Sequence, residues 1–328
     1  MLSYQISGSL KSSTSYTAES TEPRKLFSLA KLGAGRLLKE RLNRSWMSLW
    51  TVFILLTPLI IFAGLLWKSS MLLEDYTLWQ LLTTDVWKPL SGLFGFYPFI
   101  ISSLWVTFIS LAIAGPICIL SALHLTYYAN RRATRFMQPA IDILAGIPSV
   151  VYGLWGVIVI VPFISHRLAP LFGAETSGYS ILAGGLVLSV MIIPFVLNIL
   201  LEIFNSIPAE LQEASLSMGV SRWITIRSVL LRKALPGVVS ALGLGISRAF
   251  GETIAVLMVV GNVAHVPGGV FQPGYPLTSL IANNYGEMLS IPLYDSALML
   301  AALILFVIVL LFNLASRFII IRYENRYS

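Results

Sequence analysis

The sequence predicts an all-α integral membrane protein with six transmembrane helices. Only 11% of the 328 residues are charged and 56% are hydrophobic, whereas a soluble domain has about 25% charged residues. Six apolar runs each reach the roughly 20 residues that a helix needs to cross the hydrocarbon core. Basic residues gather in alternate connections between these runs. The net charge of +7 therefore indicates membrane topology, and no nucleic-acid partner is expected.

The chain before the first apolar run is polar, rich in serine and threonine, and then basic. It lacks the apolar stretch of a signal peptide. We expect residues 1–45 to form a flexible cytoplasmic tail in which Lys31–Arg44 forms a basic helix on anionic lipid. The single cysteine, Cys118, lies inside an apolar run and cannot form a disulfide within the chain.

The six apolar runs make up the predicted membrane domain, residues 46–322, which is followed by a short cytoplasmic end at 323–328. In chain order the predicted spans are Trp46–Trp67, Phe99–Leu123, Met137–Ile164, Tyr179–Phe204, Gly237–Gly261 and Tyr294–Ile320. Basic residues are frequent in the tail, in the second and fourth connections and after the last span. Because such residues mark the cytoplasmic side, both termini are expected there, and the first, third and fifth connections are expected outside.

Glycine and proline interrupt several of these spans, most clearly at Gly146-Ile147-Pro148. Proline removes a backbone donor, and in a membrane the freed carbonyl must meet a neighbouring helix or a water-filled cavity. Two interpretations stay open, an ordinary kink and a wall of a translocation path. We take Gly146, Pro148, Ser149 and Tyr152 as candidates for the path.

The fifth predicted span carries Arg248 and Glu252 in its middle. An ionised side chain at mid-bilayer costs roughly 2.5–3.5 kcal/mol even on the lenient insertion scale. An ion pair four residues apart stabilises a helix less when arginine precedes glutamate than in the reverse order. This order therefore favours an arginine that binds a ligand. The alternative is a structural ion pair that only fixes helix packing.

Small residues in the same span recur at four-residue spacing, which permits close helix approach. One row contains Gly237, Ala241 and Gly245, and the other contains Ser247, Gly251 and Ala255. We therefore expect this span to be buried among other helices, with Arg248 sheltered from lipid.

The fourth connection, residues 206–236, is too long for a simple link. Pro208 can begin a helix, Gly219 is a typical helix stop, and Ser221 can cap a second helix. The sequence therefore predicts a cytoplasmic helical hairpin. It either lies on the lipid surface or fits a groove on a soluble partner.

Several motifs carry a family resemblance. The segment Glu213-Ala214-Ser215-x-x-x-Gly219 resembles the EAA loop of ABC importer permeases. Ala145–Leu154 and Ser247–Thr253 resemble signatures of the Pst-type phosphate importer permeases. Phe94–Ile100 and the extended first outward connection resemble the C-type (PstC-like) subunit. The similarity covers about residues 46–322.

Two residues depart from the family pattern. Ser215 replaces the second alanine of the EAA motif, and Arg232 stands where the family often has proline, which comes slightly later at Pro236. The second departure leaves the end of the second coupling helix open.

The resemblance implies the MetI-like fold of type I ABC importer permeases, with ATP-driven import of phosphate by alternating access. It implies ATPase coupling through Glu213, Ala214, Ser215, Gly219 and Arg222, and a substrate path along Ser247, Arg248, Glu252 and Thr253. It also implies the following partners: a second six-helix permease (PstA-like), an ABC ATPase dimer (PstB-like), an extracytoplasmic phosphate-binding protein (PstS-like), membrane lipid and a PhoU-type regulator.

The chemistry of the residues agrees with an anionic substrate, because a planar guanidinium can engage two phosphate oxygens at once. Glu252 would then be an exchangeable partner of Arg248. The chain contains no G-x-x-x-x-G-K-[ST] motif, so we expect a transport subunit that is not an enzyme and needs a separate ATPase. No cofactor is expected, and the three histidines match no metal spacing.

Three alternatives stay open. The same machine could carry sulfate, tungstate or molybdate, the chain could be a stand-alone transporter driven by an ion gradient, or it could be a structural or receptor membrane protein. Three acidic residues are also ambiguous. Asp142 either reaches the interface or bonds to a neighbouring helix, and Glu287 and Asp295 face either solvent or a binding protein.

Overall fold

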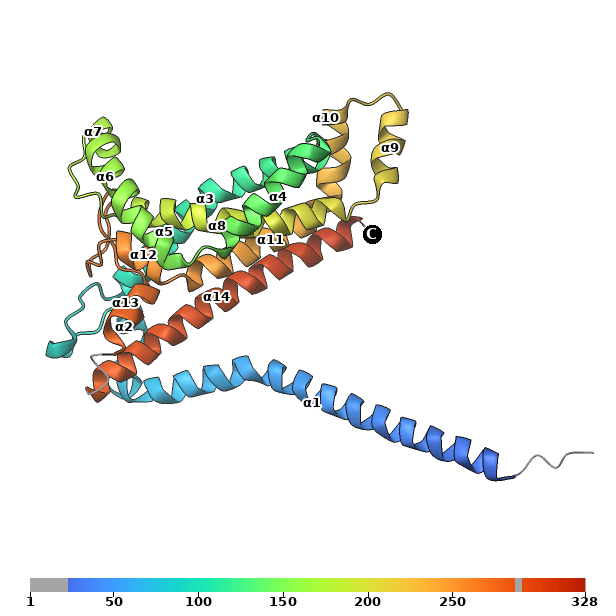
Figure 1. The fold of residues 1–328 in the computed structure, drawn as a ribbon. Helices are drawn as coiled ribbons and strands as arrows, with labels where there is room; N and C mark the ends of the chain where they lie inside the picture. The colour runs from blue at the N-terminus through green and yellow to red at the C-terminus, as the bar shows by residue number, and fades with distance from the viewer. Residues whose placement is uncertain (1–22, 287–290, 328) are drawn as a thin grey trace, which may run out of the picture. The chain divides into compact units, whose positions relative to one another are not determined.

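The computed structural model describes residues 23–286 and 291–327, which are almost entirely helical (Figure 1). The chain divides into two compact units between Ile61 and Phe62, inside the long helix α1 (Pro23–Asp75). Residues 1–22 of the predicted tail lie outside the described part, and residues 23–45 belong to α1.

Six helical stretches are long and apolar enough to cross a membrane, as predicted. They are Lys39–Asp75, Tyr97–Tyr127, Ser149–Leu171, Ile181–Asn205, Arg222–Gly251 and Pro292–Arg322. The first, second and sixth predicted spans lie within the corresponding stretches. The fourth also does, except that it was predicted to begin at Tyr179, two residues before the helix begins at Ile181. The third and fifth predicted spans need correction.

The third predicted span, Met137–Ile164, is wrong as a single helix. Helix α4 (Arg131–Gly146) ends before Ile147, whose backbone is extended, and α5 (Ser149–Trp155) begins after Pro148. Proline lacks the N–H group and disfavours helical backbone in the residue before it. The spanning stretch beyond the break consists of α5, α6 (Val161–Phe163) and α7 (Ala169–Leu171), joined by π-helical turns at Gly156–Ile160 and Ile164–Leu168.

The fifth predicted span is wrong at both ends. It begins earlier, because α10 (Arg222–Thr225) continues through a π-helical turn into α11 (Leu231–Gly251). It also ends earlier, because the backbone turns extended at Glu252 (φ −74°, ψ 130°) before the short helix α12 (Ile254–Val259). Ser247, Gly251 and Ala255 therefore do not form one row on one helix.

The other predicted row of small residues is confirmed as a packing face. A Cβ on Gly237 would lie 2.6 Å from Ile203 Cγ2, and one on Gly245 would lie 2.8 Å from Val196 Cγ2. Both partners belong to α8 (Ile181–Asn205), and Ala241 between the glycines is fully buried. The glycines thus let α11 approach the central helix α8 closely.

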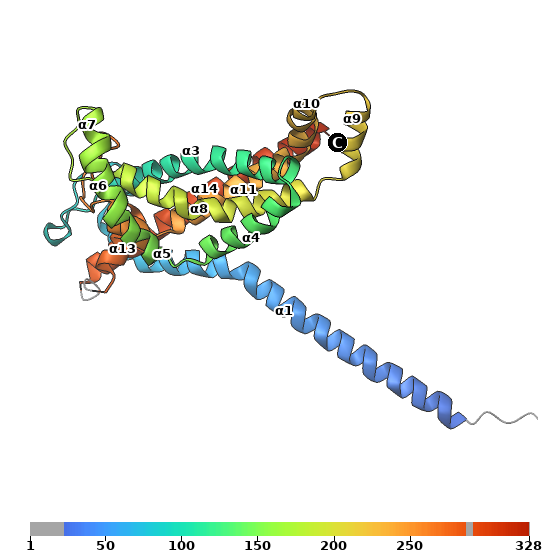
Figure 2. The ribbon, with the colours of Figure 1, turned by 45° about the horizontal axis from the view of Figure 1, so that its top comes forward.

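Helix α3 (Tyr97–Tyr127) also packs along α8, and Figures 1 and 2 show the two helices side by side. At the end of this bundle an aromatic cluster surrounds Trp87. Its ring centroid lies 5.0–5.9 Å from those of Phe94, Phe96, Phe99 and Tyr294. The Phe94–Ile100 motif therefore builds the core of the predicted outward end.

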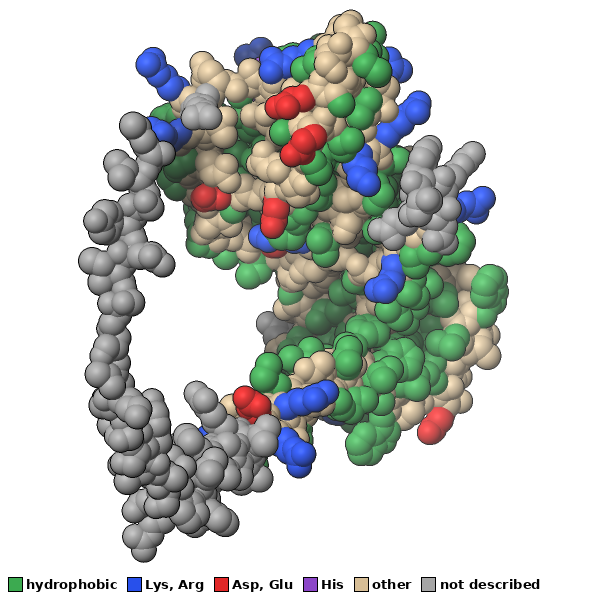
Figure 3. All heavy atoms as spheres, turned by 90° about the vertical axis from the view of Figure 1, so that its right-hand side faces the viewer, with side chains coloured by type: hydrophobic (Ala, Val, Ile, Leu, Met, Phe, Trp, Pro, Cys, Tyr) green, Lys and Arg blue, Asp and Glu red, His purple; other side chains and the backbone are tan. Residues whose placement is uncertain are grey.

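The second unit has two distinct ends (Figures 1 and 2). One end carries α2 (Leu78–Thr83), α6, α7 and α13 (Leu277–Asn284), and the other carries α9 (Ala209–Ser217), α10 and the last turns of α14 (Pro292–Tyr327). Figure 3 looks onto the end with α9 and α10, where Lys and Arg side chains are spread over the surface with acidic side chains among them.

Glu287 lies outside the described residues, and Asp295 forms contacts within the chain. Its Oδ2 accepts from Lys68 Nζ at 3.2 Å, and the neighbouring Ser296 Oγ donates to the Lys68 carbonyl and accepts from Leu72 N–H. These contacts fix the last turns of α1 against the first turn of α14.

Candidate functional site

Arg248 lies in the last turn of α11, directly before the helix break. Its guanidinium carbon is 4.6 Å from the centroid of the Phe195 ring, and the side chain is exposed in this single chain. The carbonyl end of a helix and the face of an aromatic ring both attract positive charge. The site therefore stabilises a charged arginine while leaving it open on one side.

The predicted pair of Arg248 and Glu252 is not formed. Within the described ranges, Lys68–Asp295 is the only salt bridge. Glu252 instead bridges the break, because its Oε1 accepts from Ala255 N–H at 3.4 Å and its backbone carbonyl accepts from Thr278 Oγ1 at 3.0 Å. The two residues were expected one turn apart on a helix, but α11 ends before Glu252.

The two sequence signatures meet in space. A Cβ on Gly153 of α5 would lie 2.6 Å from Met258 Sδ and 3.2 Å from Ala255 Cα, so α5 packs directly on α12. The breaks after α4 and after α11 therefore belong to neighbouring segments. Broken helices that meet in this way typically form substrate sites in transporters.

Tyr152 connects the two sides of the break between α4 and α5. Its side chain is buried, and its hydroxyl donates to the Leu144 carbonyl at 2.8 Å, which ties α5 to α4. Gly146 and Pro148 at the break are exposed, and Ser149 is half-buried. The break thus has a fixed geometry and an open side.

The other two candidates near the end of α11, Ser247 and Thr253, form hydrogen bonds within the chain. Ser247 Oγ donates to Asn313 Oδ1 of α14 at 3.1 Å, and Thr253 Oγ1 donates to the Gly251 carbonyl at 3.4 Å. Asp142 accepts from Asn198 Nδ2 at 3.1 Å, which matches the interpretation that it bonds to a neighbouring helix.

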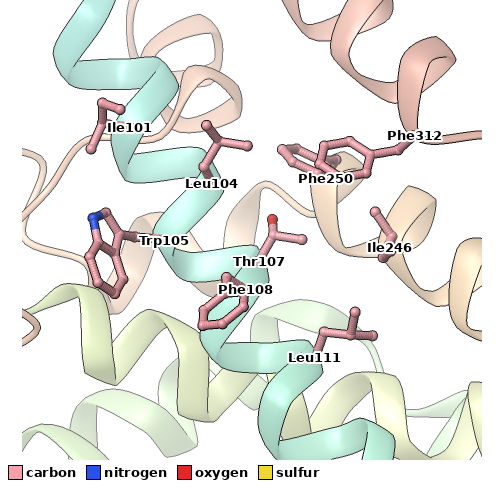
Figure 4. Close-up of a pocket in the computed structure, with 9 residues that line it drawn as sticks. All are labelled: Ile101, Leu104, Trp105, Thr107, Phe108, Leu111, Ile246, Phe250 and Phe312. Atoms are coloured by element: carbon pink, nitrogen blue, oxygen red, sulfur yellow. The ribbon is translucent and has the colours of Figure 1, made fainter. Parts of the chain in front are cut away.

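A large groove nearby is not suited to an anion (Figure 4). It encloses about 430 Å³ between α3, α11 and α14. Thr107 is its one polar lining residue, and Figure 4 shows it on α3 facing Phe250. Burying a charge among such side chains without a partner is strongly unfavourable. The groove is therefore excluded as the substrate path.

The predicted hairpin is present at the opposite end of α11. Helix α9 ends at a turn in which Gly219 has φ +78°, a conformation that favours glycine. The second arm begins at Arg222 and continues into α11 as one helical stretch, so this arm has no separate end. Glu213, Ala214 and Gly219 are exposed.

Two contacts of the hairpin were not predicted. Ser215 is buried, and its hydroxyl bonds to that of Thr225 at 2.9 Å, which links the two arms. Arg222 stacks on Tyr128 at the end of α3, with 5.6 Å from its guanidinium carbon to the ring centroid. Tyr128 is distant in sequence and Thr225 lies on the other arm of the hairpin, so no pattern within one helix could have revealed either contact.

Residues 114–326 match the family model described as "Binding-protein-dependent transport system inner membrane component". The chain belongs to this family. It is therefore the multi-pass membrane component of an ABC-type transport system that works with a binding protein and a separate ATPase. Its curated relatives are permease subunits and not enzymes.

Several curated relatives are similar over most of the permease. The probable ABC transporter permease protein YqgH of Bacillus subtilis is 38% identical over 79% of this chain and 83% of its own. The phosphate transport system permease protein PstC of Pasteurella multocida is 33% identical, covering 88% and 93% of the two chains. The probable PstC of Methanocaldococcus jannaschii is 31% identical, covering 89% and 98%.

Solved structures support the type I importer fold. The inward-facing MetNI methionine ABC transporter matches with a TM-score of 0.51 at 23% identity, covering 70% of this chain and 94% of its own. A bacterial alginate ABC transporter matches with a TM-score of 0.51 at 18% identity, covering 81% and 92%. The predicted MetI-like fold is thus confirmed.

Proposed function

We propose that this permease is the C-type subunit of an ATP-driven importer that moves inorganic phosphate into the cytoplasm. The observation that carries the proposal is the position of Arg248. Its guanidinium lies at a helix break, stacks on Phe195 and forms no salt bridge among the residues that the structure describes. The relatives named PstC have phosphate transport in their names.

The chemistry of phosphate explains why an unpaired arginine suits this place. Phosphate at neutral pH is a strongly hydrated anion, so its passage requires donors that replace water. A guanidinium offers five N–H groups in a planar fork that matches two phosphate oxygens. Ser247 and Thr253 flank the break and add hydroxyl groups nearby. Glu252 shapes the break and leaves Arg248 free for the substrate.

One arginine carries too little charge to balance a phosphate dianion. The exposed side of the site leaves room for a second subunit that could contribute more positive charge. Arg248, Gly146 and Pro148 are exposed in this chain alone. We infer that a second, PstA-like permease covers this side, contributes further donors and completes the path between the two subunits.

The hairpin of α9 and α10 is proposed to seat in a PstB-like ATPase dimer. Its exposed apolar side chains, Met218 and Trp223 among them, suit a groove on a soluble protein. The end with α2 and α13 would then face outward and receive a PstS-like binding protein, and both termini would be cytoplasmic. A PhoU-type regulator would act from the cytoplasmic side.

The test is labelled phosphate uptake into proteoliposomes that hold this chain with its native partners. Binding protein is added outside, and ATP is enclosed in one set of vesicles and omitted from the other. Uptake only with enclosed ATP is expected. Uptake without ATP would establish a gradient-driven carrier instead.

The substrate is tested in the same vesicles. Excess sulfate, tungstate or molybdate is expected to leave phosphate uptake unchanged. A complex that hydrolyses ATP but takes up one of these anions in place of phosphate would keep the importer and discard phosphate as its substrate.

A further inference from the structure

The break after Gly251 leaves backbone carbonyls that α11 cannot satisfy, because the last turn of a helix has no partners beyond its end. The carbonyl of Glu252, the residue directly after α11, accepts from Thr278 Oγ1 at 3.0 Å. An unsatisfied carbonyl inside a membrane costs several kcal/mol. The hydroxyl of Thr278, whose side chain is only 8% exposed, therefore helps to determine where α11 ends.

Thr278 can act as a fixed support because its own helix is anchored. Two backbone N–H groups at the start of α13 donate to serine hydroxyls on α3, Tyr275 N–H to Ser102 at 3.1 Å and Leu277 N–H to Ser103 at 2.9 Å. The start of α13 is thus held on the bundle by α3, and Thr278 extends that support to the break.

A small polar chamber joins the same residues. It is lined in part by Ser103, Thr107, Glu252 and Thr278 and has a volume of about 10 Å³. This is close to the smallest space that can hold one water molecule. The contact between Thr278 and Glu252 therefore lies in a polar spot behind the apolar groove, where a hydroxyl can be paired.

We propose that Thr278 is a positioning residue for Arg248, which rests on the proposed role of Arg248 in phosphate passage. By holding the Glu252 carbonyl, Thr278 fixes the end of α11, and this in turn fixes the guanidinium over Phe195. Helix α13 follows the connection at 260–276 at the proposed outward end. Movement of this end is thus transmitted through Thr278 to the substrate arginine.

The neighbouring Ser279 provides a matched control. Its side chain is fully buried, and its hydroxyl has no hydrogen-bond partner among the described residues. Ser279→Ala removes a buried hydroxyl from the same helix without touching the break. Thr278→Val removes the donor while keeping the shape, and Thr278→Ser keeps the donor while removing the methyl group.

The first measurement is ATP-driven phosphate uptake by the reconstituted complete transporter. We expect Thr278→Val to lower the maximal rate about tenfold, and Thr278→Ser and Ser279→Ala to stay within about twofold of the unchanged protein. Equal loss in Thr278→Val and Thr278→Ser would show that packing matters and the hydroxyl does not, which would overturn the proposal.

The second measurement does not depend on phosphate. Gly251 lies at the break, and a Cβ there would have no atom within 4 Å, so Gly251→Cys combined with Cys118→Ala places a reporter thiol at the end of α11. Its alkylation rate in the assembled transporter is expected to change at least about threefold with Thr278→Val and to stay unchanged with Ser279→Ala.

The two measurements separate the two hypotheses. Unchanged alkylation in Thr278→Val would refute the positioning role whatever the substrate is. Altered alkylation in a transporter that takes up no phosphate would support the link from Thr278 to the break and refute only the proposed substrate.

Discussion

Arg248 is stabilised by its surroundings without an acidic partner among the described residues, and this has a consequence for its chemistry. The carbonyl end of α11 and the ring of Phe195 both favour its charge, yet neither blocks the edge of the guanidinium. A salt bridge would have occupied that edge. The donors therefore stay available to an anion that enters from the exposed side.

Arg248→Gln is expected to abolish most ATP-driven phosphate uptake, because it removes charge-assisted hydrogen bonds worth about 1.5–3 kcal/mol each. This corresponds to a loss of roughly 10- to 100-fold. Arg248→Lys keeps the charge but loses the planar fork, so an intermediate rate is expected. The measurement is initial uptake rate in proteoliposomes at saturating binding protein.

Arg317→Gln is the matched control for this prediction, because Arg317 is exposed near the end of α14, away from the break. It should leave the uptake rate unchanged. Normal uptake by both Arg248 variants in an assembled transporter would assign Arg248 a purely structural role.

Gly153 tests the contact between α5 and α12. Gly153→Ala would place a Cβ 2.6 Å from Met258 Sδ and 3.2 Å from Ala255 Cα, and such overpacking typically costs 1–3 kcal/mol. The thermal unfolding midpoint of the purified complex should therefore fall. Gly64→Ala, whose Cβ would meet no atom within 4 Å, should not lower it. An unchanged midpoint for Gly153→Ala would contradict the packing of α5 on α12.

At the scale of elements, the hairpin of α9 and α10 shows how a departure from the family motif is compensated. Ser215 replaces an alanine, and its buried hydroxyl finds a partner in the fully buried Thr225 on the other arm. Replacing only one member leaves a buried hydroxyl without a partner, whereas replacing both removes the need for pairing. The two residues should therefore be coupled energetically.

A double-mutant cycle measures this coupling. Ser215→Ala should reduce the ATPase stimulation that external binding protein produces in the complete transporter, because the two arms are no longer tied. The double variant Ser215→Ala, Thr225→Val should recover a large part of the loss. Ser217→Ala removes an exposed hydroxyl that bonds only to Ala214 in its own helix and should have no effect. Strict additivity of the two single changes would rule out the coupling.

The two helix breaks differ in how far sequence could predict them. Pro148 indicates the first break, because proline disfavours helical backbone in the residue before it. The second break follows Gly251 without any proline, and the residue after it, Glu252, accepts a hydrogen bond from the distant Thr278. A continuous span through Arg248 was therefore a reasonable expectation that tertiary contacts overrode.

At the scale of the whole molecule, composition and charge were enough to predict six spans, and the motifs were enough to predict the family. Arg248 was found because a charge in an apolar run is costly. The contacts of Phe195 with Arg248 and of Thr278 with Glu252 join segments that are distant in sequence. Such contacts leave no periodic signal in a single sequence.

The two ends of the second unit carry the remaining prediction, which is the orientation of the chain in the membrane. Leu90 lies at the end with α2 and is 82% exposed, and Met218 lies on the hairpin and is 77% exposed. The charge distribution predicts that Leu90 lies outside and Met218 in the cytoplasm. Each can be replaced by cysteine in a Cys118→Ala background, which has no other thiol.

In cells with an accessible inner membrane, a membrane-impermeant maleimide should label Leu90→Cys directly. It should label Met218→Cys only after the membrane is permeabilised. The two positions are about equally exposed in the folded chain. Labelling is done in cells that lack the ATPase, so that a difference between the positions reports the side of the membrane and not burial of Met218 by that partner. Labelling of Met218→Cys in intact membranes would reverse the orientation, and the hairpin could then no longer reach a cytoplasmic ATPase.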